Sequence, residues 1–498
     1  MDGEISLPMW IFMILLLGAA ITFFQYIVYP MIAAYVNARS RMVLEEITPG
    51  LQLKLSPFTL TRRHVLADRL SSDDVVEAAL EGFAQKKGLS KEQIRRETWR
   101  LAWDIVPAFN PYFYFRLGFR MARACLRALY RLKVTFSDGG RLAEVASDDA
   151  VIFIINHRSN IDYAVANYLT ARRTMLSFGV GEWSRIWPIQ PFMRMAGGYF
   201  VRRNSDDPHY RLLLKRYVQL ATHARVPHAI FIEGKLSNDG GLGPPRMGLV
   251  SYVTEEFDPA ISPDIVFIPI GMNYDWVIED VNVTRYRSEQ FQAMGRGYVI
   301  RETLHFLAMM VWELLRPGRR FGVQCSNFGA PVSLSKWLAD RGVDWSSLDR
   351  GGRFAQINAL GERLMADLSG LIPATPMSVL CLIWHEDPAY LGNRDEAYDR
   401  FRMNVDRLRA AGCHVALIER SGGDGLRVSF WHALGIALER RLLTEDRERR
   451  LSMVAANAAL LDYYGHSIRQ HLGECQPGHT RPVQSSSPGF QASAPAAS

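Results

Sequence analysis

A short apolar segment that ends in a polar turn most constrains the fold of this chain. Residues 151–155 (VIFII) form a continuous, mostly β-branched run, which is typical of a strand buried on both faces of a sheet. The run stops at the polar residues 156–160, and the chain from Asp162 onward has a helical pattern. The sequence therefore predicts a buried strand that leads directly into a helix, as in an open α/β sheet.

Two titratable residues flank the polar turn. His157 follows the strand, and Asp162 stands five residues later in the first turn of the helix. This spacing lets the carboxylate accept a hydrogen bond from one imidazole nitrogen while the other nitrogen faces a substrate, as in a general base. Ser159 or Asn160 can cap the helix. A loop histidine and a helix-capping aspartate without chemistry would have the same spacing.

Charge and cysteine usage narrow the class of protein. The 498 residues carry a formal net charge of +7, but aromatic and basic residues are not interleaved as in nucleic-acid modules. A membrane surface explains the basic bias better. The five cysteines are scattered and include no C-x-x-C pair, which indicates reduced, structural residues in a cytosolic environment.

The N-terminal segment predicts a membrane anchor. Residues 7–38 contain no charged residue and exceed the roughly 20 residues that a helix needs to cross a bilayer. A cleaved signal peptide would begin with basic residues, whereas Asp2 and Glu4 are acidic. Arg39 and Arg41 follow the apolar segment directly, so the positive-inside rule places the rest of the chain in the cytoplasm.

Residues 111–133 contain a second candidate membrane contact. Their arginines recur at steps of four, three, four and four residues, which places them in one stripe along a helix. These arginines are Arg116, Arg120, Arg123, Arg127 and Arg131. Such a helix can lie in the headgroup region and attract anionic lipid. A charged helix face exposed to solvent would have the same pattern, so the sequence leaves both interpretations open.

Strand-like and helical segments alternate in the middle of the chain. The strand-like segments are 132–136, 151–155, 228–233 and 264–272, and the helical ones include 162–173 and 209–223. This alternation predicts an α/β fold with a mainly parallel sheet flanked by helices. Capped, amphipathic patterns before residue 108 predict a small helical layer whose role the sequence does not define.

The polar turn also resembles a block of a known family. The segment NHRSNIDY (156–163) resembles the H-x-x-x-x-D block of the glycerolipid acyltransferases, and in particular that of the bacterial, membrane-bound glycerol-3-phosphate 1-O-acyltransferases. Three further segments resemble the later blocks of this family in the expected order. The resemblance implies the glycerolipid acyltransferase fold behind an N-terminal transmembrane helix, with helical subdomains on either side.

The second block is GGYFVRR (197–203), which resembles the family pattern G-x-F-F-I-R-R. Arg202 and Arg203 stand at the end of an apolar strand. Paired guanidinium groups suit a phosphate, because each can donate two hydrogen bonds to it. We expect this strand to run beside the strand that ends at His157. On the residues alone, an arginine pair at the protein surface is the alternative.

The third block is a Gly- and Pro-rich loop after the strand 228–233. The residues that match the family pattern are Glu233, Gly234, Ser237, Pro244, Pro245 and Gly248. Leu236 and Asn238 depart from the pattern, because the family has arginines at these two positions. Lys235 could replace their charge but not their forked geometry. This departure leaves the identity of the substrate open.

The remaining segments complete the predicted organisation. Residues 265–280 resemble the fourth block, and 323–334 resemble the strand after it. His385 has no second metal ligand at useful spacing and is expected in a surface turn. The predicted units are a transmembrane anchor (1–38), a helical subdomain (39–108), the acyltransferase domain (109–372), a C-terminal helical region (373–474) and a disordered tail (475–498).

The resemblance implies transfer of a fatty acyl group to the sn-1 hydroxyl of glycerol 3-phosphate, with acyl-CoA or acyl-acyl carrier protein as donor and lysophosphatidic acid as product. His157 would be the general base, and Asp162 would orient it. Backbone N–H groups near the helix start would stabilise the thioester oxyanion. The implied phosphate ligands are Arg158, Arg202, Arg203, Lys235 and Arg246, and the implied substrate-binding loop contains Glu233, Gly234 and Ser237.

The same resemblance implies that neither a metal nor an organic cofactor takes part. The expected location is the bacterial inner membrane, with one membrane pass, a cytoplasmic catalytic domain, membrane lipid as a partner and no nucleic acid. Two alternatives stay open. The chain could be a related acyltransferase that uses lysophosphatidate or dihydroxyacetone phosphate, or a catalytically silent, membrane-bound lipid-binding protein. Intact His157 and Asp162 argue against the second alternative.

Overall fold

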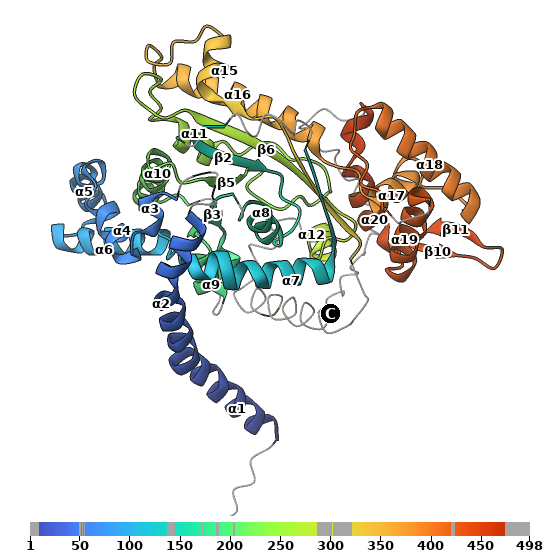
Figure 1. The fold of residues 1–498 in the computed structure, drawn as a ribbon, viewed down its shortest axis with the longest axis horizontal. Coiled ribbons are helices and arrows are strands. Elements are labelled where there is room, and N and C mark those ends of the chain that lie inside the picture. Colours follow the sequence, from blue (N-terminus) through green and yellow to red (C-terminus); the bar gives the residue numbers. More distant parts are fainter. Residues whose placement is uncertain are drawn as a thin grey trace, which may run out of the picture.

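The computed structural model describes most of the chain (Figure 1). The described residues are 9–48, 51, 53, 55–136, 145–146, 148–171, 173–185, 189–202, 205–285, 301, 321–419 and 424–473. Arg203 and the predicted tail (475–498) lie outside these ranges, so their predicted roles stay predictions.

An eight-stranded sheet lies at the centre of the molecule (Figure 1). Its strand order is β1-β7-β6-β2-β5-β3-β4, and β8 pairs with β6. The strands are β1 (Arg131–Phe136), β2 (Ala150–Ile155), β3 (Ser177–Val180), β4 (Gly198–Phe200), β5 (His228–Phe231), β6 (Ile265–Tyr274), β7 (Val323–Phe328) and β8 (Val332–Ser333). Neighbouring strands are parallel except where β6 meets β7 and β8. The prediction of a mainly parallel α/β sheet is confirmed.

Strand β2 is buried on both faces, as its apolar sequence predicts. All six of its residues are buried, and β5 and β6 pair with it on either side. Val151, Phe153 and Ile155 belong to the core on one face of the sheet, whereas Ile152 and Ile154 belong to the core on the other face. The turn after β2 therefore starts from a rigid, central position.

Helices cover both faces of the sheet. The face of Val151 packs against α7 (Phe119–Leu129) and α8 (Asp162–Thr170). The opposite face packs against α10 (Pro208–His223), α11 (Gly248–Thr254) and α16 (Arg350–Leu371). The other elements among the described residues of this part are the π-helical turn η3 (Phe113–Gly118), the 3-10 turn η5 (Glu182–Arg185), α9 (Ile189–Met195), α12 (Asp280–Arg285) and α15 (Leu334–Asp340).

A long apolar helix precedes the body of the protein. It consists of α1 (Met9–Phe23), the π-helical turn η1 (Phe24–Val28) and α2 (Tyr29–Ile47). Within the described ranges, Met9–Ser40 is the one helix that is long and apolar enough to cross a membrane, with a mean hydropathy of 2.3. α1 and η1 contain no buried residue, and Figure 1 shows α1 projecting away from the body.

Four helices that follow the apolar helix in the sequence form a layer against α10. They are α3 (Pro57–Leu60), α4 (Arg63–Ser71), α5 (Asp74–Lys87) and α6 (Lys91–Ile105). The side chain of Asp73 caps α5, and Gly88 ends it with a φ of +63°. Ser90 and Gln93 form a capping box at the start of α6. The layer shares one apolar core with α10.

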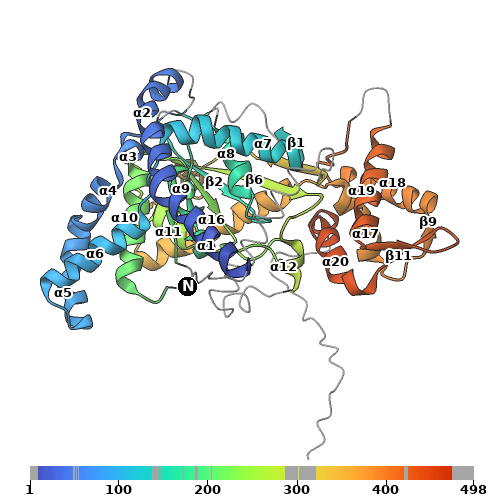
Figure 2. The same ribbon diagram turned by 90° about the horizontal axis from the view of Figure 1, so that it is seen from below.

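The C-terminal region lies to one side of the sheet (Figure 2). Its elements are α17 (Pro376–Glu386), α18 (Arg394–Ala410), α19 (Gly425–Glu439), η6 (Ala455–Asn457), α20 (Ala458–His466), η7 (Arg469–Leu472) and a small antiparallel sheet of β9 (Gly392–Asn393), β10 (Leu443–Glu445) and β11 (Arg450–Met453). The expected surface turn at His385 is wrong. Its side chain is 7% exposed and pairs with Asp462, because α20 packs along α17.

Candidate active site

His157 and Asp162 meet at the carboxyl end of β2. The strand ends at Ile155, and Asp162 is the first residue of α8. His157 Nδ1 lies 3.0 Å from Asp162 Oδ2, and both side chains are buried. The structure therefore brings together the two residues that the sequence spacing singled out.

Asp162 is held by three donors besides the imidazole. The backbone N–H groups of Arg158 and Ser159 donate to its Oδ2 over 2.7 and 2.9 Å, and the Tyr274 hydroxyl donates to its Oδ1. Burial and the neighbouring carboxylate raise the pKa of Tyr274 well above its usual value, so its hydroxyl stays a donor. A carboxylate fixed in this way favours the imidazole tautomer with its proton on Nδ1.

The imidazole lies against aromatic side chains. Its ring centroid is 4.3 Å from that of Phe231 and 5.6 Å from that of Tyr163. These contacts fix the plane of the ring, and their low polarity strengthens the hydrogen bond to Asp162. Nε2, the ring nitrogen opposite Asp162, is then the atom that can accept a proton.

The backbone N–H groups of the turn are all engaged within the protein. The pairs, donor first, are His157 with Glu233, Arg158 and Ser159 with Asp162, Asn160 with Glu279, Ile161 with the Ser159 hydroxyl, and Asp162 with the Ser159 carbonyl. These six N–H groups are therefore engaged, and the prediction that N–H groups near the helix start stabilise an oxyanion stays a prediction. The prediction that Ser159 or Asn160 caps α8 is wrong, because no side chain caps this helix.

The loop of the third block is tied to the turn through Glu233 and Ser237. Glu233 accepts the N–H of His157 over 2.9 Å and that of Gly243 over 2.8 Å. Burial raises the pKa of Glu233 to about 7, although the two N–H donors oppose the shift. The N–H of Ser237 donates to the His157 carbonyl over 2.9 Å. Glu233 and Ser237 thus position the loop beside the imidazole.

The same loop packs against helix α20 of the C-terminal region. Gly240 adopts a φ of +82°, and a Cβ at this position would lie 1.8 Å from the Tyr463 carbonyl oxygen. His466 Nδ1 lies 3.0 Å from the Asp239 carbonyl oxygen. Only glycine fits at position 240, so α20 fixes the path of the loop.

Lys235 and Arg246 are the basic residues of this loop. Lys235 is half-buried and Arg246 is exposed. Gly234, with a φ of +66°, allows the Arg246 stem to approach, since a Cβ at residue 234 would lie 3.0 Å from Arg246 Cγ. Neither cation forms an ion pair with a described residue. Both belong to the loop that bonds to the backbone of His157, through the Glu233 side chain at its N–H and through the Ser237 N–H at its carbonyl.

Arg158 points toward the C-terminal region. Its side chain is buried, its Nη2 donates to the Ser467 carbonyl over 3.3 Å, and its guanidinium lies 5.8 Å from the Tyr463 ring. The sequence placed Arg158 among the phosphate ligands. In the structure it links the turn after β2 to the end of α20.

Arg202 lies farther from His157 than the sequence predicted. Strands β5 and β3 lie between β2 and β4, so the expectation that β4 runs beside β2 is wrong. Three strand spacings correspond to roughly 14 Å. The Arg202 guanidinium lies 3.1 Å from an Asp104 carboxylate oxygen that Arg185 also contacts at 2.9 Å.

Glu279 and Asn156 are residues of the site that the sequence analysis missed. Glu279 accepts hydrogen bonds from the Ser159 hydroxyl over 2.6 Å and from the Asn160 N–H over 3.2 Å. Burial raises its pKa to about 7. The Asn156 side chain donates to the Met272 carbonyl and accepts the N–H of the same residue. The acidic end of the fourth block, at 279–280, was the available signal for Glu279.

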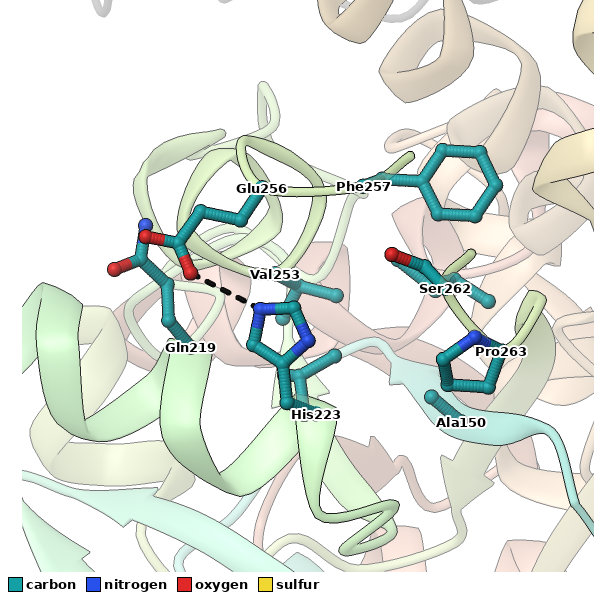
Figure 3. Close-up of a pocket in the computed structure, with 10 residues that line it drawn as sticks. Ala150, Gln219, His223, Val253, Glu256, Phe257, Ser262 and Pro263 are labelled. Carbon is teal, nitrogen blue, oxygen red and sulfur yellow. Dashed lines mark hydrogen bonds and ion pairs between the residues drawn. The ribbon is translucent and has the colours of Figure 1, made fainter. Parts of the chain in front are cut away.

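The cavity drawn in Figure 3 lies at the other end of the sheet. It is lined by Ala150 and Ile265, the first residues of β2 and β6, and by His223, which pairs with Glu256 at 3.0 Å. Its volume of about 10 Å³ is at the limit for a single water molecule. It is therefore separated from His157, which follows the carboxyl end of β2. Within the described ranges, no three His, Cys, Asp or Glu side chains are grouped to hold a metal ion.

Comparisons with known proteins agree with the geometry. The model of the Acyltransferase family matches residues 139–273, which include the turn after β2 and the third block. A glycerol-3-phosphate acyltransferase of Aeromonas hydrophila is 25% identical over 369 residues, which cover 72% of this chain and 44% of that protein. One from Actinobacillus succinogenes is 24% identical over 430 residues, which cover 83% of this chain and 50% of that protein.

The chain spans about half the length of the curated relatives that it matches. A 1-acyl-sn-glycerophosphate acyltransferase structure from Thermotoga maritima covers 61% of the chain at 14% identity, with a TM-score of 0.28. The chain is thus similar in sequence to the glycerol-3-phosphate acyltransferases, the family that its four sequence blocks resemble.

Proposed function

We propose that this protein transfers a fatty acyl group from acyl-CoA or acyl-acyl carrier protein to the sn-1 hydroxyl of glycerol 3-phosphate and so forms lysophosphatidic acid. The observation that carries the proposal is the buried His157–Asp162 pair at the end of β2, inside a segment that matches the Acyltransferase family. The names of the relatives supply the acceptor.

His157 acts as the general base. Its Nε2 takes the proton of the sn-1 hydroxyl while the oxygen attacks the thioester carbonyl carbon. A new C–O ester bond forms, the C–S bond breaks, and the departing sulfur takes the proton back from the imidazolium. No acyl-enzyme is needed, because the enzyme holds donor and acceptor together and the reaction behaves as if at high effective concentration.

Asp162 orients and stabilises the base. It accepts the Nδ1 proton over 3.0 Å, so Nε2 is presented for catalysis, and its negative charge favours the imidazolium that forms during the reaction. The N–H groups of Arg158 and Ser159 hold the carboxylate in one orientation. The carboxylate therefore does not have to reorient when the hydroxyl proton moves to the imidazole.

Lys235 and Arg246 bind the acceptor phosphate. They belong to the loop that is bonded to His157 through Glu233 and Ser237, and neither is neutralised by a described carboxylate. Arg202 is a weaker candidate, because it is paired with Asp104 three strand spacings away. Arg203 follows it directly in the sequence and has the same candidate role.

The N-terminal helix anchors the enzyme in the bacterial inner membrane with a single pass. The exposed, apolar α1 and η1 span 20 residues, or about 30 Å of helix, which matches a bilayer core. Arg39 and Arg41 follow on the cytoplasmic side, and the catalytic domain with them.

A second candidate function is acylation of another alcohol, such as lysophosphatidate or dihydroxyacetone phosphate. Leu236 and Asn238 favour it, because the family pattern has arginines at these positions. The distance of Arg202 from the turn after β2 also favours it, since fewer guanidinium groups then surround the acceptor.

The test is a transfer assay with purified full-length protein in detergent. Labelled acyl-CoA and acyl-acyl carrier protein are each offered with glycerol 3-phosphate, dihydroxyacetone phosphate or lysophosphatidate, and the lipid product is identified. We expect labelled lysophosphatidic acid from glycerol 3-phosphate and at least about a hundredfold less from the His157→Ala variant. Preferential acylation of another acceptor would establish the second candidate. Absence of transfer to all three would reject both.

A further inference from the structure

Three arginines of the predicted stripe, Arg120, Arg123 and Arg127, lie on α7, directly beside the point where the N-terminal helix enters the body. Arg116 lies just before α7 in η3, and the prediction that Arg131 continues the helix is wrong, because it is the first residue of β1. Val36 of α2 is buried in a cluster with Phe113 and Met195. Asn110 bonds to Asn37 and Ser40 of α2 over 2.7 and 3.0 Å. The segment that leads into α7 is therefore fixed to the same part of α2 that follows the exposed, apolar span.

This docking sets the height of α7 relative to a bilayer. If α1 crosses the membrane, the membrane surface lies where α2 begins to contact the body. Figure 1 shows α7 running across the lower edge of the body from this point, with α1 descending below the edge. Because α7 begins at the level of the membrane surface and runs across the direction of α1, its whole length stays at the membrane surface.

The exposed face of α7 has the composition of an interfacial helix. Arg120 and Arg127 are exposed, and Met121, 54% exposed, lies beside them. Leu126 and Leu129 on the opposite face are buried in the core. An apolar side chain among arginines fits the boundary between headgroups and acyl chains.

The charge of this face is strongly positive. Residues 105–137 contain no Asp or Glu. Arg116 at the start of the stripe is paired with Glu46, whereas Arg120, Arg123 and Arg127 form no ion pair with any described residue. Anionic lipid headgroups supply the complementary charge at the height where these guanidinium groups lie.

We propose that α7 is a second membrane contact, which binds anionic phospholipid headgroups through Arg120, Arg123 and Arg127 and inserts Met121 between them. The inference rests on the proposed anchoring by α1, but not on the proposed acyl transfer. It adds a lipid-binding surface on the catalytic domain itself and fixes which side of the domain faces the membrane.

Site-specific photo-crosslinking of the full-length protein tests this contact. A benzoylphenylalanine is placed at Met121, at Met403 or at Leu16, and each protein is reconstituted into phosphatidylcholine vesicles with or without phosphatidylglycerol. Met403 is a matched control, because it is 53% exposed on the arginine-rich α18. Leu16 on α1 reports insertion of the anchor separately.

We expect lipid adducts at Met121 but not at Met403, and more of them in the vesicles that contain phosphatidylglycerol. Changing Arg120, Arg123 and Arg127 to Gln should reduce the Met121 adducts in these vesicles by up to about fivefold for each arginine. The same change at the α18 arginines 400, 402 and 409 should leave them unaltered. Adducts at Leu16 without adducts at Met121 would overturn the proposal, as would equal yields at Met121 and Met403.

Discussion

The turn after β2 and the arginine segment after β4 make an instructive comparison. Both follow a buried strand of one sheet, and both resemble blocks of one family. The turn after β2 is fixed from all sides, with six consecutive backbone N–H groups bonded within the protein. The Arg202 guanidinium, in contrast, shares the Asp104 carboxylate with Arg185 at the outer edge of the sheet.

The difference shows what a strand end does and does not determine. In parallel strands, the carboxyl ends lie at the same edge of the sheet. The position of a residue along the strand direction can therefore be predicted from the sequence. The lateral distance depends on strand order. β5, which leads into the third block, pairs directly with β2, whereas β4 is three strand spacings away.

Replacement of His157 should have the largest effect. We expect His157→Ala to lower turnover by roughly 10²–10⁴-fold, because the general base is lost. The measurement is acyl transfer at saturating donor and acceptor. His223→Ala is the control, since His223 also pairs with a carboxylate but lies at the opposite end of the sheet. Near-normal turnover of His157→Ala would show that the reaction does not take place at the turn after β2.

Asp162→Asn should lower turnover by about a hundredfold, with little change in the Michaelis constants. Asp162 Oδ2 accepts from His157 Nδ1 and from two backbone N–H groups, and a neutral amide there no longer stabilises the imidazolium. Turnover as a function of pH is the measurement. An unchanged pH profile with unchanged turnover would mean that Asp162 only caps the turn.

Lys235→Ala or Arg246→Ala should raise the Michaelis constant for the phosphorylated acceptor tenfold or more and leave that for the acyl donor unchanged. A charge-assisted hydrogen bond contributes roughly 1.5–3 kcal/mol, and each 1.4 kcal/mol is about a factor of ten. Arg246→Lys should restore only part of the loss, because the guanidinium fork is absent.

Arg202→Ala is the variant in the arginine segment after β4 that is compared with Lys235→Ala and Arg246→Ala. It should change the same constant by no more than about fivefold, the size of an exposed ion pair. Arg203→Ala extends the test to the residue that the sequence singled out with it. If these two variants raised the constant more than Lys235→Ala and Arg246→Ala do, the phosphate would bind after β4 instead.

The smallest expected effect concerns pH and stability. Burial raises the pKa of Glu233 and Glu279 to about 7, so between pH 4.5 and 7 the folded protein holds protons that the unfolded chain has released. The contribution of these two carboxyl groups to the free energy of unfolding should therefore fall as the pH rises through this interval. His228 and His432, whose pKa burial lowers to about 4, act in the opposite direction, so the effect is measured against the Glu279→Gln variant. The difference in melting temperature between the native chain and this variant isolates one carboxyl group and should change by roughly 3 °C across the interval. A difference that does not change with pH would show that Glu279 is ionised in the folded protein.

The sequence predicted what depends on local pattern. The buried β2, the five-residue spacing of His157 and Asp162, the caps at Asp73 and Ser90 and the apolar N-terminal helix all follow from neighbouring residues. The neighbours of β4 and the bonding of the N–H groups around Ser159 depend on partners that are distant in sequence. No local pattern could reveal that the end of α20 lies against the turn after β2.

The contact between Gly240 and Tyr463 limits which loop sequences this protein can accept, in evolution or in engineered variants. The loop that carries Lys235 and Arg246 runs against the backbone of α20, where a single added methyl group would collide with the Tyr463 carbonyl. A loop taken from a relative therefore has to fit against this backbone of α20. The loop and α20 therefore have to be exchanged together. A chimaera that exchanges both should retain its activity, whereas one that exchanges only the loop should lose it.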